Sequence, residues 1–208
     1  MFMKWQLYFL LIVPVVLTVL RIKSQTYVLS AAITLSCALI VALSGFGESK
    51  AWVIVGLCLS VVGDWFLNHQ IGHPDRFLFG VGGFALAHIA FVIYASHDAV
   101  FKPWATILIV ALTVGYAVYL TQRIVKGLNP TLQAALPAYA LVSLVGLLMA
   151  LSRRTTPYAW ALYALGILSI VFSDTMIAES QFAHNRGAQA LILPTYYLCH
   201  IFIAASCI

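Results

Sequence analysis

Short polar clusters divide the chain into apolar stretches, each about long enough to cross a bilayer. Hydrophobic residues make up 63% of the 208 positions and charged residues only 8%, which is too little polar surface for a soluble globule. In a bilayer every backbone amide needs a partner within the protein, and apolar runs without two-residue alternation favour helices over a barrel. The sequence therefore predicts an all-α integral membrane bundle of about eight transmembrane helices.

The predicted spans follow one another through short connections that carry nearly all of the charge. They are residues 5–20, 26–44, 51–68, 77–97, 103–121, 131–152, 157–180 and 188–208. Nothing in the composition marks a second unit, so we expect residues 1–208 to form one multi-pass transmembrane domain, in the cell inner membrane if the source is bacterial. An even number of spans places both termini on one side. Lys plus Arg then total five on that side and six on the other, and the positive-inside rule leaves the orientation open.

The remaining composition argues against several classes of protein. The four cysteines lie inside apolar runs without CxxC spacing, at Cys37, Cys58, Cys199 and Cys207. We interpret them as small packing residues and expect neither a disulfide framework nor a zinc site. The net charge of +5 is spread over the connections, as is common near anionic headgroups, and gives no reason to expect a nucleic-acid partner.

Four ionisable side chains lie well inside predicted spans: Asp64, His88, Asp174 and His200. Burying such groups at membrane depth costs free energy, so each one is a candidate functional residue. Packing hydrogen bonds by the aspartates and ordinary interior histidines are the alternative interpretations, and they remain open.

Both aspartates have polar neighbours on their own helices. Ser60, Asp64 and Asn68 are spaced four residues apart and form one polar stripe, which must face protein or water. Ser173 directly precedes Asp174. At 1.5 Å per residue, both aspartates lie in the half of the membrane away from the termini, where they can meet.

The third and seventh spans run in one direction, and the fourth and eighth run in the other. The same counting places His88 and His200 near mid-depth, with Tyr196 one turn from His200 and closer to the aspartates. The connections above this zone contain Arg76 and Arg186, which are either ordinary loop charges or binding residues. A buried acid pair below these arginines suits an amphiphile whose phosphate stays at the interface.

Several of these residues lie in stretches that resemble a known family. The stretches are Gly-Asp-Trp-Phe-Leu at 63–67, the run 77–94 with its Ala87-His88 pair, Ser173-Asp174, and Pro-Thr-Tyr-Tyr at 194–197. In order and spacing they resemble the lysoplasmalogenase family, the YhhN-like eight-span membrane proteins. The resemblance implies that Asp64 and Asp174 are the catalytic pair. Where the family tends to carry a glutamine after the last tyrosines, this chain has His200, whose role stays open.

The resemblance also implies a reaction, which is hydrolysis of the vinyl ether of a lysoplasmalogen. The products would be a fatty aldehyde and glycerophosphoethanolamine or glycerophosphocholine, and the partners would be a lysophospholipid substrate and membrane lipids, with no cofactor or metal. The chemistry needs a protonated acid and an ionised base, because a vinyl ether must first be protonated on carbon. Two carboxyl groups in one desolvated site supply both forms and can stabilise an oxocarbenium ion. Which aspartate is the acid stays open, and His88 and Tyr196 are supporting candidates.

Three other functions fit parts of the pattern. An intramembrane aspartyl protease also uses two aspartates, but here the Gly-Asp element comes in the first acidic span and neither Leu-Pro-Ala at 136–138 nor Leu-Pro-Thr at 193–195 is the expected motif. A metal-dependent lipid amidase would use His69 and His73, which lie in a polar loop. A proton- or cation-coupled transporter of small molecules or lipids would use the aspartates as relays, although no inverted repeat is evident. Headgroup preference, chain length and oligomeric state are not determined by the sequence.

Overall fold

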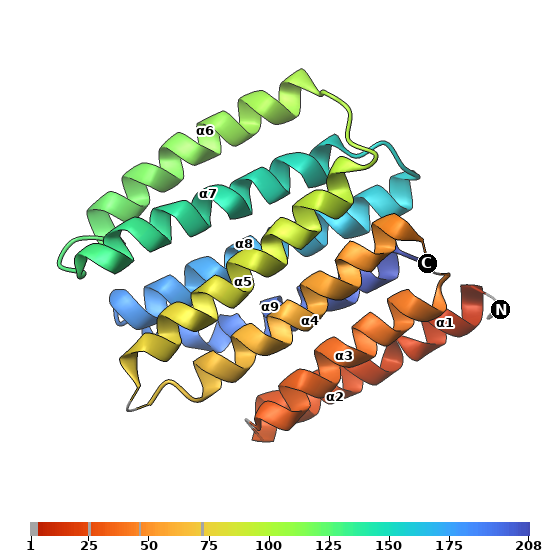
Figure 1. Ribbon diagram of the computed structural model, residues 1–208, viewed down its shortest axis with the longest axis horizontal. Helices are drawn as coiled ribbons and strands as arrows, with labels where there is room; N and C mark the ends of the chain where they lie inside the picture. Colours follow the sequence, from red (N-terminus) through yellow and green to blue (C-terminus); the bar gives the residue numbers. More distant parts are fainter. Residues whose placement is uncertain (1–3, 25, 46, 72) are drawn as a thin grey trace.

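The protein is a bundle of helices that run side by side (Figure 1). The computed structural model describes residues 4–24, 26–45, 47–71 and 73–208. The helices are α1 (Lys4–Leu10), α2 (Ile12–Ser24), α3 (Tyr27–Leu43), α4 (Glu48–Asn68), α5 (Pro74–Ser96), α6 (Pro103–Tyr119), α7 (Pro130–Ser152), α8 (Pro157–Phe182) and α9 (Arg186–Ser206), with a π-helical segment η1 (Leu120–Ile124) after α6. The start of α1 and the end of α9 lie at the same end of the bundle (Figure 1), which we call the terminal end.

The helices have the length and apolarity that a membrane requires. Among the described residues, seven helical segments are long and apolar enough to cross a bilayer, with α1 joined to α2 and α6 joined to η1, and α3 is a shorter apolar helix beside them. The predicted all-α bundle of about eight membrane helices is therefore confirmed. Predicted and observed ends differ by at most four residues, the largest difference being at the end of α2. The chain is a multi-pass integral membrane protein.

Local sequence signals explain where several helices begin. Proline occupies the first helical position of α5, α6, α7 and α8, where its missing amide hydrogen costs no helical bond. The side chain of Asn129 accepts a hydrogen bond from the Leu132 amide at 2.9 Å and caps α7. Thr156 caps α8 in the same way through the Ala159 amide at 3.3 Å.

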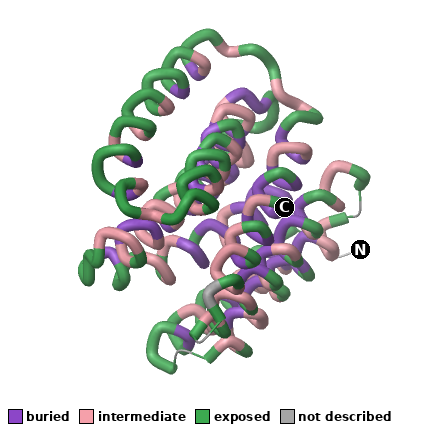
Figure 2. The backbone as a smooth tube through the Cα atoms, turned by 60° about the vertical axis from the view of Figure 1, so that its left-hand side comes forward, coloured by how far each residue is buried: buried purple, intermediate pink, exposed green. Residues whose placement is uncertain are grey.

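Two helix pairs, α4 with α5 and α8 with α9, approach most closely, and glycines make this possible. A Cβ atom at Gly83 of α5 would lie 3.1 Å from the Cα atom of Gly63 in α4. A Cβ atom at Gly166 of α8 would lie 2.8 Å from Ile203 Cγ1 and 3.2 Å from the Cys199 carbonyl oxygen of α9. Lipid provides no hydrophobic drive for helix association, so close packing at small residues holds such pairs together. By contrast, α6 lies at the edge of the bundle and is largely exposed (Figure 2).

The close approach of α8 and α9 makes a stability prediction possible. We expect Gly166→Ala to lower the apparent midpoint of thermal unfolding in detergent, because overpacking against α9 costs about 1 to 3 kcal/mol. Gly115→Ala in α6 is the matched control, since a Cβ atom there meets nothing within 4 Å. Helix propensity alone favours alanine by about 1 kcal/mol, so the control should leave the midpoint unchanged or raise it. Equal midpoints for the two variants would contradict the packing described here.

The cysteines are free, and three of them are packing residues. Cys37, Cys199 and Cys207 are buried, as predicted. Cys58 is exposed on α4, so the prediction of a packing role is wrong for this residue, whose side chain faces outward from the bundle.

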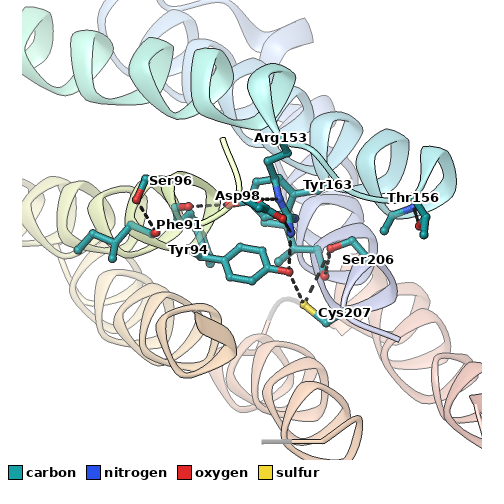
Figure 3. A network of polar contacts seen from close by, with 12 residues as sticks. Phe91, Tyr94, Ser96, Asp98, Arg153, Thr156, Tyr163, Ser206 and Cys207 are labelled. Carbon is teal, nitrogen blue, oxygen red and sulfur yellow. Dashed lines mark hydrogen bonds and ion pairs between the residues drawn. The ribbon is translucent and has the colours of Figure 1, made fainter. Parts of the chain in front are cut away.

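A buried polar cluster, which we call the Arg153 cluster, joins helices at the terminal end (Figure 3). Arg153, which follows α7, is only 6% exposed. Its Nε and Nη2 atoms donate to the Asp98 carboxylate at 2.9 and 2.8 Å, and Nη2 donates to the Tyr94 hydroxyl at 3.2 Å. The guanidinium also lies over the rings of Tyr94 and Tyr163, 4.4 and 4.7 Å from their centroids. These contacts fix α5, α7 and α8 to one another at this end.

Candidate active site

The polar residues of the membrane interior form two groups in the half of the bundle away from the terminal end. The first, the Asp174 group, comprises Asp174 of α8, His88 of α5, and Tyr139 and Ser143 of α7. The Tyr139 hydroxyl donates to Asp174 Oδ2 at 2.7 Å, and His88 Nε2 lies 3.5 Å from the same oxygen. The His88 ring stacks on the Tyr139 ring, with centroids 5.2 Å apart. Three helices thus position one carboxyl group.

The hydrogen bonds of His88 define its neutral form. Ser143 Oγ donates to the Tyr139 carbonyl oxygen at 3.1 Å, so it acts as acceptor for His88 Nδ1, which lies 2.9 Å away. A neutral His88 ring therefore carries its hydrogen on Nδ1 and presents the lone pair of Nε2 to Asp174. His88 Nε2 has no hydrogen-bond partner among the described residues, so its lone pair is available to a proton in the Asp174 group.

A narrow apolar cavity of about 50 Å³ reaches the Asp174 group from among α5, α6, α7 and α8. Asp174 and Tyr139 provide its polar wall. The other lining residues are apolar or aromatic: Leu67, Phe77, Val81, Phe84, Tyr116, Leu120, Leu136, Ala140, Ile177, Ala178 and Phe182. A carboxyl group at the wall of a water-poor space is suited to hold or donate a proton.

The second group, the Asp64 group, contains a cation. Asp64 of α4 is 8% exposed and lies beside Tyr196 of α9, and Arg21 of α2 contacts Asn68, one turn further along α4. Arg21 is 5% exposed, and it donates to Ser30 Oγ at 2.7 Å and to Asn68 Oδ1 at 3.4 Å. The Asn68 amide in turn donates to the Asp64 carbonyl oxygen at 2.8 Å.

Several buried polar atoms around Asp64 have no hydrogen-bond partner among the described residues. They are Asp64 Oδ2, Arg21 Nη1, the Tyr196 hydroxyl and His200 Nε2. The rings of Tyr196 and His200 are in contact, with centroids 4.5 Å apart. Buried polar atoms in proteins are almost always hydrogen-bonded, so this group of donors and acceptors is available to the polar atoms of a ligand or to water.

Two aromatic rings connect the Asp64 and Asp174 groups. Phe84 lines the apolar cavity and packs edge-on against Tyr196, with centroids 5.7 Å apart. The two aspartates have different partners, since Tyr139 donates to Asp174 and Asp64 lies beside Tyr196. The order of helices accounts for this difference, because α4 packs on α3 and α5 while α8 packs on α7 and α9. That the two aspartates act together stays a prediction.

Three other candidates from the sequence have structural partners. Ser60 is fully buried and donates to a carbonyl oxygen of its own helix at 3.0 Å. Ser173 donates to the Ile192 carbonyl oxygen at 3.1 Å and joins α8 to α9. His200 is fully buried, with Nδ1 at 3.1 Å from Thr34 Oγ1, so only its Nε2 is free for the site. These serines support the helices that carry the aspartates.

The arginines differ from the expectation. Arg76 donates to the His69 carbonyl oxygen at 2.9 Å and lies over the Trp65 ring, so the structure does not place it at the site with Arg186. Arg186 instead lines a cavity with Arg21. The predicted first span ends at residue 20 and therefore places Arg21 in a connection, whereas Arg21 lies in the last turn of α2. The signal for Arg21 was available, since an arginine that follows an apolar run directly can occupy the last turn of its helix.

In the polar loop considered for a metal-dependent amidase, His69 has a partner in its own helix. His69 Nδ1 lies 2.7 Å from the Trp65 carbonyl oxygen, and the ring packs against Trp65. Across the part of the chain that the structure describes, no group of three or more His, Cys, Asp or Glu side chains is arranged to hold a metal ion. Gly72, which lies between His69 and His73, is outside the described residues.

Comparison with known proteins finds a family and two named relatives for this chain. The family described as YhhN matches residues 6–207. The chain is similar to a protein named Lysoplasmalogenase from Mycobacterium bovis, with 29% identity over 157 residues, which are 73% of this chain and 57% of the relative. It is also similar to Lysoplasmalogenase TMEM86B from Sus scrofa, with 30% identity over 151 residues, or 72% of this chain and 60% of the relative.

The aligned parts thus span about three-fifths of the length of these curated relatives. No solved structure matches the chain. The family match, however, extends over nearly all of the sequence, from the first span to the end of α9. The chain therefore belongs to the YhhN family.

Proposed function

We propose that the protein is a lysoplasmalogenase, which hydrolyses the vinyl ether bond of a lysoplasmalogen to a fatty aldehyde and a glycerophosphodiester. Two relatives carry this name. The observation that supports the reaction most directly is the Asp174 group, in which a carboxyl group with Tyr139 and His88 as partners lines an apolar cavity inside the membrane bundle. This arrangement combines a proton donor with an apolar opening at which the first carbons of an alkenyl chain can lie.

The reaction requires a proton on carbon before water can attack. In the proposed first step the acid transfers a proton to the outer vinyl carbon, the double bond shifts, and an oxocarbenium ion forms at the carbon that carries the oxygen. Water then adds to that carbon and loses a proton to the base. The resulting hemiacetal breaks its bond to the glycerol oxygen, which takes up a proton, so one water molecule is consumed in total.

Asp174 is the proposed acid. Asp174 lines the apolar cavity, and the Asp174 group contains no Lys or Arg that would favour a permanently ionised carboxylate. After the transfer, the carboxylate stabilises the oxocarbenium ion, as carboxylates do in glycoside hydrolysis. Tyr139 keeps the carboxyl group oriented through its 2.7 Å hydrogen bond.

Asp64 is the proposed base. Arg21, which donates to Asn68 one turn further along α4, brings a positive charge to this end of the helix, and the unpartnered atoms of Arg21, Tyr196 and His200 can position the attacking water. The acid and the base do not need to touch, because they act on opposite faces of the reacting carbons. Inverting glycosidases, whose two carboxyl groups are separated to leave room for water, follow the same logic. In this proposal the vinyl ether lies at the Phe84–Tyr196 pair when substrate is bound.

Detergent-purified protein tests the proposal, since hydrolysis needs no sealed compartment. We expect aldehyde release from a synthetic lysoplasmalogen and none from the saturated ether analogue. In heavy water, aldehyde trapped at once by reduction should carry one deuterium on the carbon next to the carbonyl carbon, because the acid delivers a solvent-derived proton there. Folded protein that releases no aldehyde across several headgroups would refute the proposed activity, and uptake into proteoliposomes would then test the transporter alternative.

A further inference from the structure

A second cavity, of about 550 Å³, lies where α2 and α4 end and α9 begins. These helix ends lie away from the terminal end (Figure 1), at the depth of one membrane interface. The polar lining residues are Arg21, Asn68, Arg186 and Gln189, and the others are Ile22, Ala190, Ile192, Leu193 and Pro194. The lining thus contains two cations and no carboxylate, which is the composition expected of an anion site.

Arg21 is a buried cation that hydrogen bonds hold in place at this cavity. Its side chain is 5% exposed and is held by the 2.7 Å hydrogen bond to Ser30 and the 3.4 Å hydrogen bond to Asn68. Its Nη1 atom has no hydrogen-bond partner within the described ranges of the chain. A guanidinium group that is fixed on one side and free on the other is preorganised to bind an oxyanion.

Arg186 adds the second charge. It is the first residue of α9, it is exposed, and it makes no hydrogen bond or ion pair with the rest of the described structure. The start of a long helix also carries a partial positive charge that favours phosphate. Arg186 and Arg21 together give the described lining of the cavity two positive charges and no negative one.

We propose that this cavity binds the phosphodiester group of a single-chain phospholipid. Phosphate and vinyl ether are separated in such a lipid only by glycerol. Arg21 connects the cavity to Asp64 through Asn68, so a phosphate bound here would place the glycerol ether oxygen near the Asp64 group. The apolar cavity on the other side of the Phe84–Tyr196 pair receives the chain. The vinyl ether identity of the ligand rests on the proposed function, whereas the selectivity for phosphate does not.

A binding experiment with a ligand that cannot be cleaved tests this site. The probe is a saturated alkyl ether lysophosphocholine, compared with the alkylglycerol of equal chain length that lacks the phosphate. We expect wild-type protein in detergent to prefer the phosphate-bearing lipid about tenfold or more, and Arg186→Gln to remove most of this preference, since a charge-assisted hydrogen bond supports a change of that size. Gln189→Glu, which adds a negative charge to the cavity, should lower the affinity as well.

Arg76→Gln is the matched control, because it removes the same charge on the same side of the membrane outside the cavity, and it should keep the preference. The site is refuted if Arg186→Gln and Gln189→Glu both bind like wild type, or if Arg76→Gln loses the preference as strongly as Arg186→Gln. Inorganic phosphate and glycerophosphocholine form the last arm, and binding of either as tightly as the lipid would assign the site to free phosphates instead. Because the probe is not hydrolysed, these results are separate from any failure of aldehyde release.

Discussion

Asp174→Asn is expected to lower aldehyde release by about 10² to 10⁴-fold, the range that general acid catalysis contributes. Asparagine has the shape of aspartate and can still accept the hydrogen bond from Tyr139, but it has no acidic proton to transfer to carbon. The loss should appear in the maximal rate more than in the substrate concentration for half-saturation, because Asp174 acts on the transition state. Initial rates with a synthetic lysoplasmalogen measure both quantities.

Asp75→Asn is the matched control for this variant. Asp75 is an exposed carboxylate in the first turn of α5, on the same side of the membrane as Asp174 and outside both cavities. The control removes the same charge and should keep the wild-type rate. If Asp174→Asn keeps more than about a tenth of the wild-type rate and an unchanged unfolding midpoint, Asp174 is not the general acid.

Asp64→Asn is expected to cause a second loss of about 10² to 10⁴-fold, because the attacking water loses its base. In the double variant with Asp174→Asn, the rate should fall by much less than the two single fold-losses multiplied together. The effects of residues that act on the same step are not additive. This variant also leaves the buried Arg21 without its carboxylate, so a lower stability is expected as well.

Two measurements separate the loss of the base from the loss of stability in Asp64→Asn. The unfolding midpoint reports the stability loss, and binding of the saturated ether lysolipid reports whether the site is intact. Retained binding with lost turnover would support a role as base. Full turnover by a folded Asp64→Asn protein would leave Asp64 with a packing role, which the sequence alone also allowed.

Hydropathy was sufficient to predict the spans, because each helix must bury about 20 residues in the same apolar layer. Hydropathy also marked Asp64 and Asp174 as candidates, since burying a carboxylate at membrane depth costs free energy that a functional role can explain. It did not mark Tyr139 and Ser143, because a tyrosine and a serine in an apolar helix are common and cost little. Only their contacts with His88 and Asp174 show that they support the candidate acid.

Depth along the membrane is one coordinate, and the order of helices around the bundle is another. Counting residues placed both aspartates in one half of the membrane, but it could not show that each has its own partners or that Phe84 packs against Tyr196. The sequence also does not show in which direction a long side chain points. Arg21 turns inward to Ser30 and Asn68, and Arg76 turns to the His69 carbonyl, although both looked like loop charges in the sequence.

The Arg153 cluster also determines how the apolar cavity can widen. At the terminal end, directional contacts from Asp98, Tyr94 and Arg153 fix α5 to its neighbours. At the other end, α5 meets α8 through the rings of Phe77 and Phe182, 5.5 Å apart, while glycine packing at Gly63 and Gly83 holds α5 against α4. Helix α5 is therefore held at both ends, and the Phe77 and Phe182 rings are the part of the cavity lining that can move without shifting it. Rotation of these rings can widen the cavity for a chain while His88 and Asp174 keep their positions.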